Sequence, residues 1–281
     1  LLAIPLPEGM AASLFANLEV AGTIGKPALN GELGAAGIRI PKAPSLPDLA
    51  AGLGFKTAEE RLDTTVRVSD PAGDLVTLTS SLPFDLEEIV SDPSKCLDLP
   101  LAANLTIDEL KVERLRGAHP LLEEVDGQLD VALEVKGSVN APEVAGSLRA
   151  TGVRLVKQET LPVVAAVVEL GMEGRVLKAT GKLTEPGGEI VSLRGSFPLE
   201  VRKGLEDPEL VKTLPLEAGV TMKDFFLGRL AVLAPRAEGA VGAINIDASV
   251  TGTIDDPVLA GGAAIKVDRF PLPRTPYREV T

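Results

Sequence analysis

The stretch LEVKGSVNAPEVAGSL, from Leu133 to Leu148, occurs in three related copies along the chain. The first copy is LEVAGTIGKPALNGEL (Leu18 to Leu33), and the third is ASVTGTIDDPVLAGGA (Ala248 to Ala263). The matching glycines and prolines of the copies are 115 residues apart, with no gap needed to align them. A fixed period of this length is typical of an array in which each unit buries its apolar face against the next. The sequence therefore predicts that residues 1–281 are a section of one continuous array without independent domains, with repeat marks at 18–33, 133–148 and 248–263.

Apolar and polar side chains alternate around the second copy. Leu129, Val131 and Leu133 point to one side of a strand, whereas Asp130 and Glu134 point to the other. A period of two is the signature of a β-strand with one dry and one wet face. The glycine and the proline in the middle of each copy predict a strand, a turn and a returning strand.

Each unit is expected to contain further strands, and one segment that breaks the alternation. The additional strands are predicted around Leu161–Leu170, Val176–Leu183, Ile190–Leu199 and Leu214–Met222. Asp108–Leu115 and Asp224–Leu233 instead carry apolar residues at helical spacing behind an Asp suited to cap a helix. We therefore expect about six strands and one short helix or capping loop in each unit.

A single layer of sheet has to remove its apolar face from water. The expected helices are too few to cover six strands per unit, and a closed barrel does not explain an array. Because the chain has no Trp, one Tyr and seven Phe, aliphatic residues supply nearly all of its apolar side chains. Larger side chains would be needed to fill the centre of a sheet folded fully onto itself. The sequence thus predicts an all-β fold: an elongated, curled antiparallel β-sheet built from 115-residue repeats, with an aliphatic inner face around an open groove.

A family resemblance rests on the G-T-I-x-x-P-x-L-x-G pattern within alternating strands. Together with the recurring L-P-L segments (Leu99–Leu101 and Leu214–Leu216) and the short D-L-type helix, it resembles the repeats of the AsmA-like superfamily, closest to the TamB type. The resemblance covers essentially the whole chain. It implies a long curled sheet (a β-taco) in a protein of the cell envelope of a diderm bacterium, spanning the periplasm and anchored to the inner membrane by an N-terminal segment missing here. It further implies a groove that conducts phospholipid, and an outer-membrane barrel of the assembly-factor type as a partner of some members.

The composition disfavours several other functions. A net charge of −12 argues against nucleic acid as a partner and against flat adsorption onto anionic lipid headgroups. His119 is the only imidazole and Cys96 the only thiol, so neither a multi-histidine metal site nor an intramolecular disulfide can form. We expect His119 to be a surface residue, Cys96 to be structural, and the protein to be no enzyme and to use no cofactor or metal.

The function expected from these observations is that of a section of a periplasm-spanning hydrophobic groove, which conducts phospholipid between the inner and outer membranes. Two alternatives stay open. One is a scaffold for outer-membrane protein assembly, in which an exposed sheet edge pairs with a client strand by β-augmentation. The other is a purely structural β spacer with a dry core. The residues expected to line the groove, and to contact phospholipid acyl chains through apolar area alone, are Leu18, Val20, Ile24, Leu29, Leu33, Val66, Leu78, Leu129, Val131, Leu133, Val135, Val139, Val144, Leu148, Leu183, Val191, Leu193, Ile244, Ile246, Val250 and Ile254.

Overall fold

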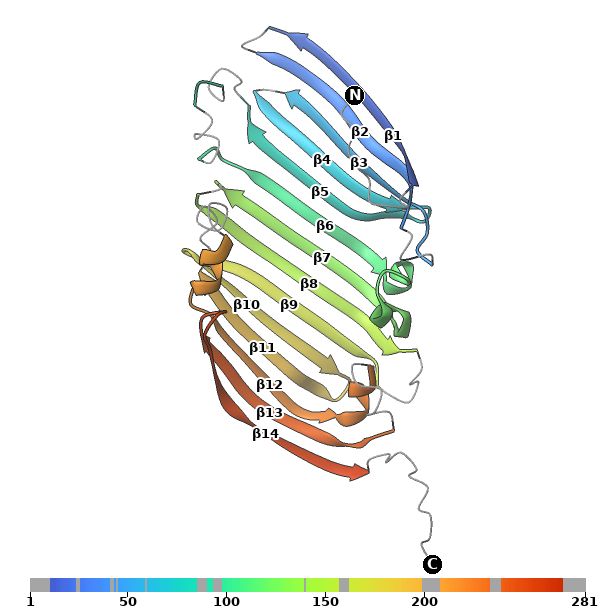
Figure 1. Ribbon diagram of the computed structural model, residues 1–281, viewed down its shortest axis with the longest axis vertical. Helices are drawn as coiled ribbons and strands as arrows, with labels where there is room; N and C mark the ends of the chain where they lie inside the picture. The colour runs from blue at the N-terminus through green and yellow to red at the C-terminus, as the bar shows by residue number, and fades with distance from the viewer. Residues whose placement is uncertain are drawn as a thin grey trace, which may run out of the picture.

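The computed structural model contains fourteen β-strands, with 3-10 segments in several of the connections (Figure 1). It describes residues 11–23, 26–40, 43, 45–58, 60–84, 90–92, 98–138, 140–156, 162–198, 208–232 and 239–269. The strands are β1 (Ala11–Gly22), β2 (Pro27–Arg39), β3 (Leu49–Ala58), β4 (Arg61–Asp70), β5 (Gly73–Pro83), β6 (Ala102–Lys111), β7 (Val125–Gly137), β8 (Pro142–Leu155), β9 (Val164–Glu173), β10 (Val176–Glu185), β11 (Gly188–Pro198), β12 (Glu217–Phe226), β13 (Val241–Gly252) and β14 (Pro257–Arg269). The 3-10 segments are η2 (Val112–Leu115), η3 (Pro120–Glu124), η4 (Pro208–Thr213) and η5 (Leu227–Val232).

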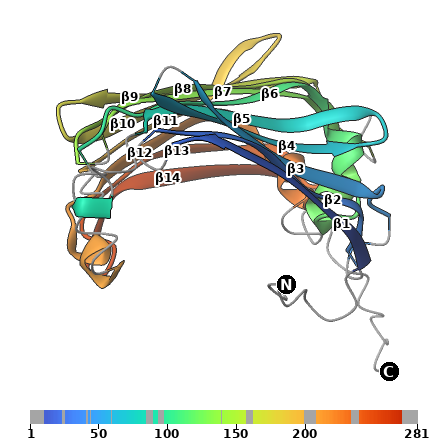
Figure 2. The ribbon, with the colours of Figure 1, turned by 90° about the horizontal axis from the view of Figure 1, so that it is seen from above.

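All fourteen strands form one antiparallel sheet in which their order in space is their order in the chain. The sheet does not close, so β1 and β14 are its two edge strands. Viewed along the stacking direction of the strands, the sheet is an arc with a convex and a concave side (Figure 2). The fold is therefore all-β, antiparallel and curled, as the sequence predicts.

A proline turn joins β1 to β2, β7 to β8 and β13 to β14. In the middle hairpin, Gly137 ends β7 with a φ of +86°, and Ser138 and Ala141 exchange backbone hydrogen bonds of 3.2 and 3.1 Å before β8 begins. A Cβ atom on Gly137 would lie 2.4 Å from the carbonyl oxygen of Ala141. Glycine is required here because only glycine combines this φ with so close a backbone approach. The strand, turn and returning strand expected around each proline are confirmed.

Several elements recur at a constant offset along the chain. β3 and β9 begin and end 115 residues apart, and the same offset relates β4 to β10, β5 to β11 and β6 to β12. Glu109 in β6 and Asp224 in β12 are also 115 residues apart, and both have left-handed backbone, with φ of 47° and 48°. The backbone N–H of Glu109 donates to Asp130 Oδ1 at 2.8 Å, and that of Asp224 donates to Asn245 Oδ1 at 3.0 Å. Each contact lies at a register shift between neighbouring strands, so the same β-bulge is fixed in the same way twice.

The helix expected in each unit is not confirmed. Asp108, which was expected to cap the first helix, lies inside β6, and Asp224 lies inside β12. The strands continue past both residues because they pair with β7 and β13, and only the 3-10 segments η2 and η5 follow them. Backbone pairing with a neighbouring strand outweighs the local helical spacing of a few apolar residues.

Little of the sheet is deeply buried. Among the described residues, the one cluster of buried apolar side chains consists of Leu227, Ala240 and Ile244, against which Phe225 and Ile246 pack. The cluster lies where η5 covers the beginning of β13. Ala240 is 1% exposed, and the other buried apolar residues of the described part are 3% to 7% exposed. A single curved layer holds its shape mainly through backbone pairing and cross-strand side-chain contacts.

Candidate functional site

One uninterrupted row of apolar residues crosses the whole sheet. Residues paired directly across neighbouring antiparallel strands point to the same face, so the pairing register assigns each residue to a face. The row that contains Leu133 has one member in each of the fourteen strands. From β1 to β14 its members are Ala16, Leu33, Leu53, Val66, Leu78, Leu105, Leu133, Gly146, Leu170, Ala179, Gly195, Ala218, Val250 and Leu259. We call the face that carries this row the apolar face.

The opposite face is mostly polar, although Phe15 and Val167 also lie on it. The row directly beside the apolar one, followed from β1 to β12, consists of Asn17, Glu32, Gly54, Thr65, Thr79, Asn104, Glu134, Ala145, Gly171, Lys178, Ser196 and Glu217. No large apolar side chain interrupts it. One face of the sheet is therefore suited to water and the other to apolar contact.

Most residues predicted to line a groove lie in described strands, and all of these share the apolar face. They are Leu18, Val20, Leu29, Leu33, Val66, Leu78, Leu129, Val131, Leu133, Val135, Val144, Leu148, Leu183, Val191, Leu193, Ile244, Ile246 and Val250. Ile254 instead lies in the turn between β13 and β14 and is half exposed, because the strand ends at Gly252. Ile24 and Val139 lie outside the described residues.

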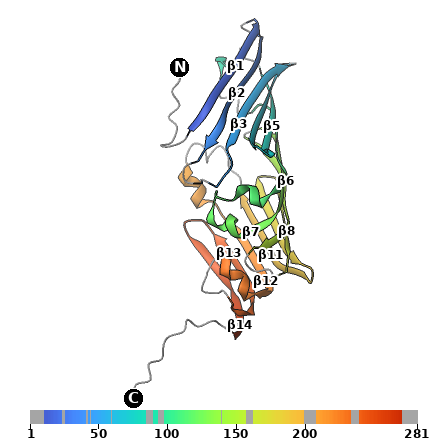
Figure 3. The same cartoon turned by 90° about the vertical axis from the view of Figure 1, so that its right-hand side faces the viewer.

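The apolar face lies on the concave side of the sheet. Leu227 of η5 packs on Ile244, which belongs to the apolar face, and Figures 2 and 3 show η2 and η5 on the inner side of the arc. Extensive contacts between described strands are confined to neighbours in the sheet, so the two arms of the arc do not pack together. Leu33 remains 42% exposed and Leu193 48% exposed. The concave side is thus an open apolar groove along the stacking direction of the strands.

An apolar hollow of this face lies over β9 to β13. It has a volume of about 350 Å³, and its floor is formed by small residues, among them Ala179, Gly195 and Ala218. Larger side chains, including Val168, Leu193 and Val250, stand around it. At the positions 115 residues earlier, Thr64 and Ser80 replace Ala179 and Gly195, and their hydroxyl groups hydrogen-bond to each other at 2.7 Å. The groove is therefore lined unevenly, with a polar contact at β4–β5 and a smooth hollow at β10–β11.

Sequence reasoning missed some of the residues that shape the apolar face. Leu53, Leu105 and Leu170 belong to the central row but were not among the predicted lining residues. Phe55, also on this face, places its ring over Gly31, where a Cβ atom would lie 2.4 Å from Phe55 Cζ. The alternation of apolar and polar residues in Leu49–Ala58 is weak, since two glycines interrupt it. The strand at Leu49–Ala58 could have been predicted from its match to Val164–Glu173, which lies 115 residues later.

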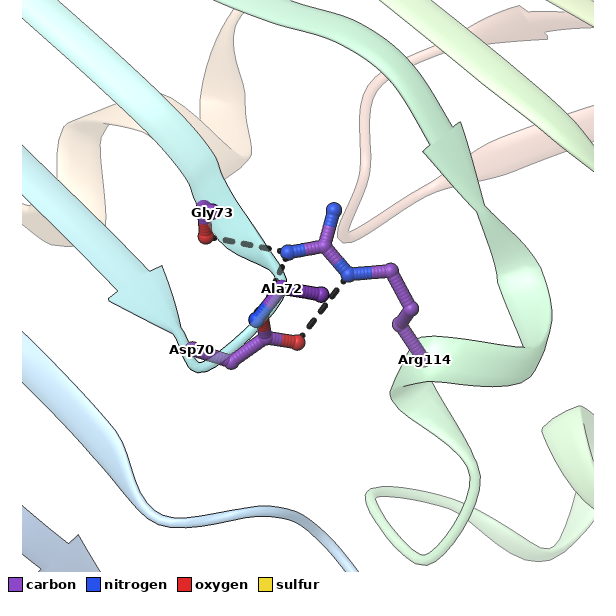
Figure 4. Close-up of polar contacts among 4 residues, drawn as sticks. All are labelled: Asp70, Ala72, Gly73 and Arg114. Carbon is purple, nitrogen blue, oxygen red and sulfur yellow. Dashed lines mark hydrogen bonds and ion pairs between the residues drawn. The ribbon is translucent and has the colours of Figure 1, made fainter.

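A rim of ion pairs borders the groove on the side of η2 and η5. Arg114 of η2 donates from Nε to Asp70 Oδ2 at 3.0 Å and from Nη2 to both Asp70 Oδ1 and the carbonyl oxygen of Gly73 (Figure 4). The carboxylate also accepts the backbone N–H of Ala72 at 2.7 Å. The hydrogen bonds from Arg114 are the main reason why the pKa of Asp70 is lowered, and they raise the pKa of Arg114. Asp70 is therefore ionised at neutral pH.

The residues considered for other chemistry are the single imidazole and the single thiol of the chain. His119 is exposed, next to η3, and its carbonyl oxygen accepts the backbone N–H of Leu122 at 2.9 Å. Cys96 lies outside the described residues. Within the described ranges, no helix has the length and apolar character needed to cross a bilayer. A comparison of the chain with models of known protein families, with curated proteins and with solved structures finds no match.

Proposed function

We propose that this protein forms a section of a hydrophobic groove that conducts phospholipid between the inner and outer membranes, in the manner implied by its resemblance to AsmA-like proteins. The observation that carries the proposal is the central apolar row, which crosses all fourteen strands on the concave side. A row of this length without a charged residue fits an acyl chain that has to pass from strand to strand. The proposal places the intact protein in the periplasm.

The energetics of a sliding acyl chain suit such a surface. Burying a methylene group is worth about 0.8 kcal/mol, so a whole chain is held firmly while each step along the groove exchanges equivalent contacts. Aliphatic side chains bind without directional hydrogen bonds, which would hold a ligand in one place. The headgroup would remain in water at the open side of the groove, because burial of an unpaired charge among apolar residues is costly.

Residue-by-residue photo-crosslinking tests this proposal. We would place a photo-reactive amino acid at Val250, on the apolar face, and at Thr251, the next residue on the polar face, and analyse the products from cells by mass spectrometry. Val135 and Lys136 form a second pair of neighbours on opposite faces. Phospholipid adducts at Val250 and Val135, but not at Thr251 and Lys136, are expected. Equal capture on both faces, or capture of protein alone at the apolar positions, would contradict the conduit.

The proposal includes a longer array built from 115-residue units. The recurring strand bounds, the paired bulges at Glu109 and Asp224, and the three proline turns support a common unit. In such an array β1 and β14 would be internal strands with a neighbour on each side. Adding units would lengthen the groove without changing its cross-section, which is the property needed to bridge two membranes.

A second candidate function rests on the free edge of β14. All thirteen of its residues are exposed, and only β13 pairs with it among the described strands. A strand of this kind presents a row of unpaired backbone groups to which another strand can add. The alternative is therefore a scaffold that pairs with client outer-membrane strands. Charged substitutions on β14 that block crosslinking to a client, while leaving lipid capture at Val135 intact, would favour the scaffold.

The third possibility, a structural spacer with a dry core, is disfavoured by the open concave side. A dry core needs side chains from two walls in contact along their length. The described strands make extensive contacts only with their neighbours in the sheet. Large apolar residues such as Leu18 and Leu193 remain about half exposed. A surface of this kind is typical of a site that binds an apolar partner.

A further inference from the structure

Two ion pairs, 115 residues apart, connect the 3-10 segments to strands that are not their sheet neighbours. Arg114 of η2 reaches Asp70 at the end of β4, although η2 follows β6 and β5 lies between the two strands. Arg229 of η5 reaches Glu185 at the end of β10, although η5 follows β12. We call these contacts the two clasps. In each clasp, the arginine belongs to the 3-10 segment and the carboxylate to the last residue of a strand.

The clasps differ from the other ion pairs in the described part of the chain by their burial. The side chains of Arg114 and Asp70 are 19% and 2% exposed, and those of Arg229 and Glu185 are 9% and 18% exposed. In every other ion pair among the described residues, each side chain is more than 20% exposed. Exposed pairs contribute little, whereas the loss of one partner of a shielded pair leaves a poorly solvated charge.

The geometry of the first clasp fixes the direction of its arginine. The Asp70 carboxylate is held by the backbone N–H of Ala72, and the carbonyl oxygen of Gly73 accepts from Arg114 Nη2 at 3.0 Å (Figure 4). The second clasp is an ion pair without hydrogen-bond geometry, since the buried Nε and Nη2 of Arg229 make no hydrogen bond. Its guanidinium carbon lies 5.9 Å from the centre of the Phe225 ring. A planar guanidinium with two or more contacts is oriented as well as attracted.

The segments held by the clasps lie over one end of the apolar face. Leu227, the first residue of η5, packs on Ile244 and thereby shields the rim end of β13. Leu110, just before η2, is 3% exposed at the corresponding place of β6. Neither segment has the backbone pairing that holds a strand in the sheet. Apart from its clasp, each segment is held by its connection to the preceding strand and by contacts with the strand that follows, β7 for η2 and β13 for η5.

We infer that Arg114 and Arg229 are positioning residues that hold η2 and η5 against the sheet as one wall of the groove. Release of a clasp would let the segment move away and would uncover the rim end of the apolar face. This role concerns the wall itself and does not depend on what the groove carries. Under the proposed function, the same wall would limit sideways escape of an acyl chain.

Hydrogen exchange at single amides tests the first clasp. The backbone N–H of Arg116 donates to the carbonyl oxygen of Glu113 at 3.3 Å, and that of Ala118 donates to Leu115 at 3.0 Å. In Arg114→Gln these two amides should exchange at least about tenfold faster, because the local opening of η2 becomes easier. The amides of Ser138 and Ala141, in the turn between β7 and β8, should keep their wild-type rates.

Nuclear magnetic resonance of methyl groups tests the second clasp. A nuclear Overhauser contact between the methyl groups of Leu227 and Ile244 is expected in the wild-type protein, because the two side chains belong to one buried cluster. Arg229→Gln should remove this contact. Asp70→Glu and Glu185→Asp exchange the two carboxylates that the chain itself uses at equivalent places. They should keep wild-type exchange and the methyl contact.

The matched control is Arg39→Gln. Arg39 also binds a carboxylate in bidentate geometry, at 2.8 and 2.9 Å from Asp48, but its side chain is 73% exposed. This variant should change neither readout. Unchanged exchange at Arg116 and Ala118, or a retained methyl contact, would overturn the role of the corresponding clasp. Equal acceleration at Ser138 would do so too, because it would indicate loss of overall stability. If Arg114→Gln does not fold, Asp70→Asn breaks the same clasp with a smaller change.

Discussion

The side chain of Leu133 lies over Gly146, its partner across β7 and β8, so that a Cβ atom on Gly146 would come within 2.9 Å of Leu133 Cδ1. The carbonyl oxygen of Ala132 would be 3.2 Å from the same atom. The glycine is thus part of the apolar surface, since its missing side chain provides the space in which the leucine rests. Gly31 has the same relationship to the ring of Phe55.

Gly146→Ala should lower the free energy of unfolding by about 1 to 3 kcal/mol, because the added methyl group forces Leu133 or the backbone to move. Gly171→Ala is the control, since nothing lies within 4 Å of a Cβ atom at that position on the polar face. That change should be neutral or slightly stabilising. Urea denaturation of both variants gives the comparison. Similar midpoints for the two variants would argue against close packing at Gly146.

A carboxylate should be tolerated on one face of β13 and not on the other. Val250 pairs with Ala218 and Leu259 on the apolar face, whereas Thr251 is exposed on the polar face. Val250→Asp should cost about 1 to 3 kcal/mol of stability because the new charge lies among apolar groups without a partner. Thr251→Asp should leave the urea midpoint close to that of the wild type. Equal losses would show that the two faces do not differ in polarity as the register indicates.

The bulge at Glu109 should depend on a side-chain acceptor rather than on a charge. Asp130 accepts the Glu109 N–H, and Asn245 accepts that of Asp224 in the same geometry. Asp130→Asn should therefore keep wild-type stability, while Asp130→Ala should lose about 1 kcal/mol. Thermal unfolding of the two variants, measured side by side, distinguishes the roles. If Asp130→Asn were as damaging as Asp130→Ala, the negative charge would be essential.

Stability should fall in acid partly through the first clasp. Arg114 lowers the pKa of Asp70 below 3.8, so the native state holds this carboxyl group ionised at a pH where the unfolded chain binds a proton. The stabilisation is complete above the unfolded pKa and is lost as the pH falls through the lower, folded one. The stability difference between wild type and Arg114→Gln, measured in urea, should be constant from pH 7 to pH 5 and should shrink below about pH 4. A difference that does not change down to pH 2 would exclude Asp70 as its source.

The alternation of side chains was sufficient to predict the faces of several strands. Val131, Leu133 and Val135 alternate with polar residues, and their facing depends only on the local period of a strand. The turn before Pro142 was also predictable, because glycine and proline restrict the backbone locally. The curl follows less directly from the sequence. It was inferred from the need to shelter an apolar face with few aromatic residues.

The remaining features depend on contacts between distant parts of the chain. The apolar spacing in Asp108–Leu115 favours a helix locally, but pairing with β7 keeps its first half in a strand. The clasp between Asp70 and Arg114 joins residues 44 positions apart, so no short sequence motif predicts it. The sequence shows only that an acidic residue and an arginine recur 115 positions later, as Glu185 and Arg229.

The sequential order of the strands has a consequence for how the sheet can form. Each strand pairs only with the strands next to it in the chain. The pairing of a strand therefore does not require the prior synthesis of a distant segment. Closing the short loop of a hairpin costs little conformational entropy, and each new hairpin finds a ready template in the edge already present. Such a chain can assemble progressively from its first hairpin, strand by strand in the order of synthesis. At every stage of this assembly, the strand added last has one edge whose backbone groups are not yet paired with another strand.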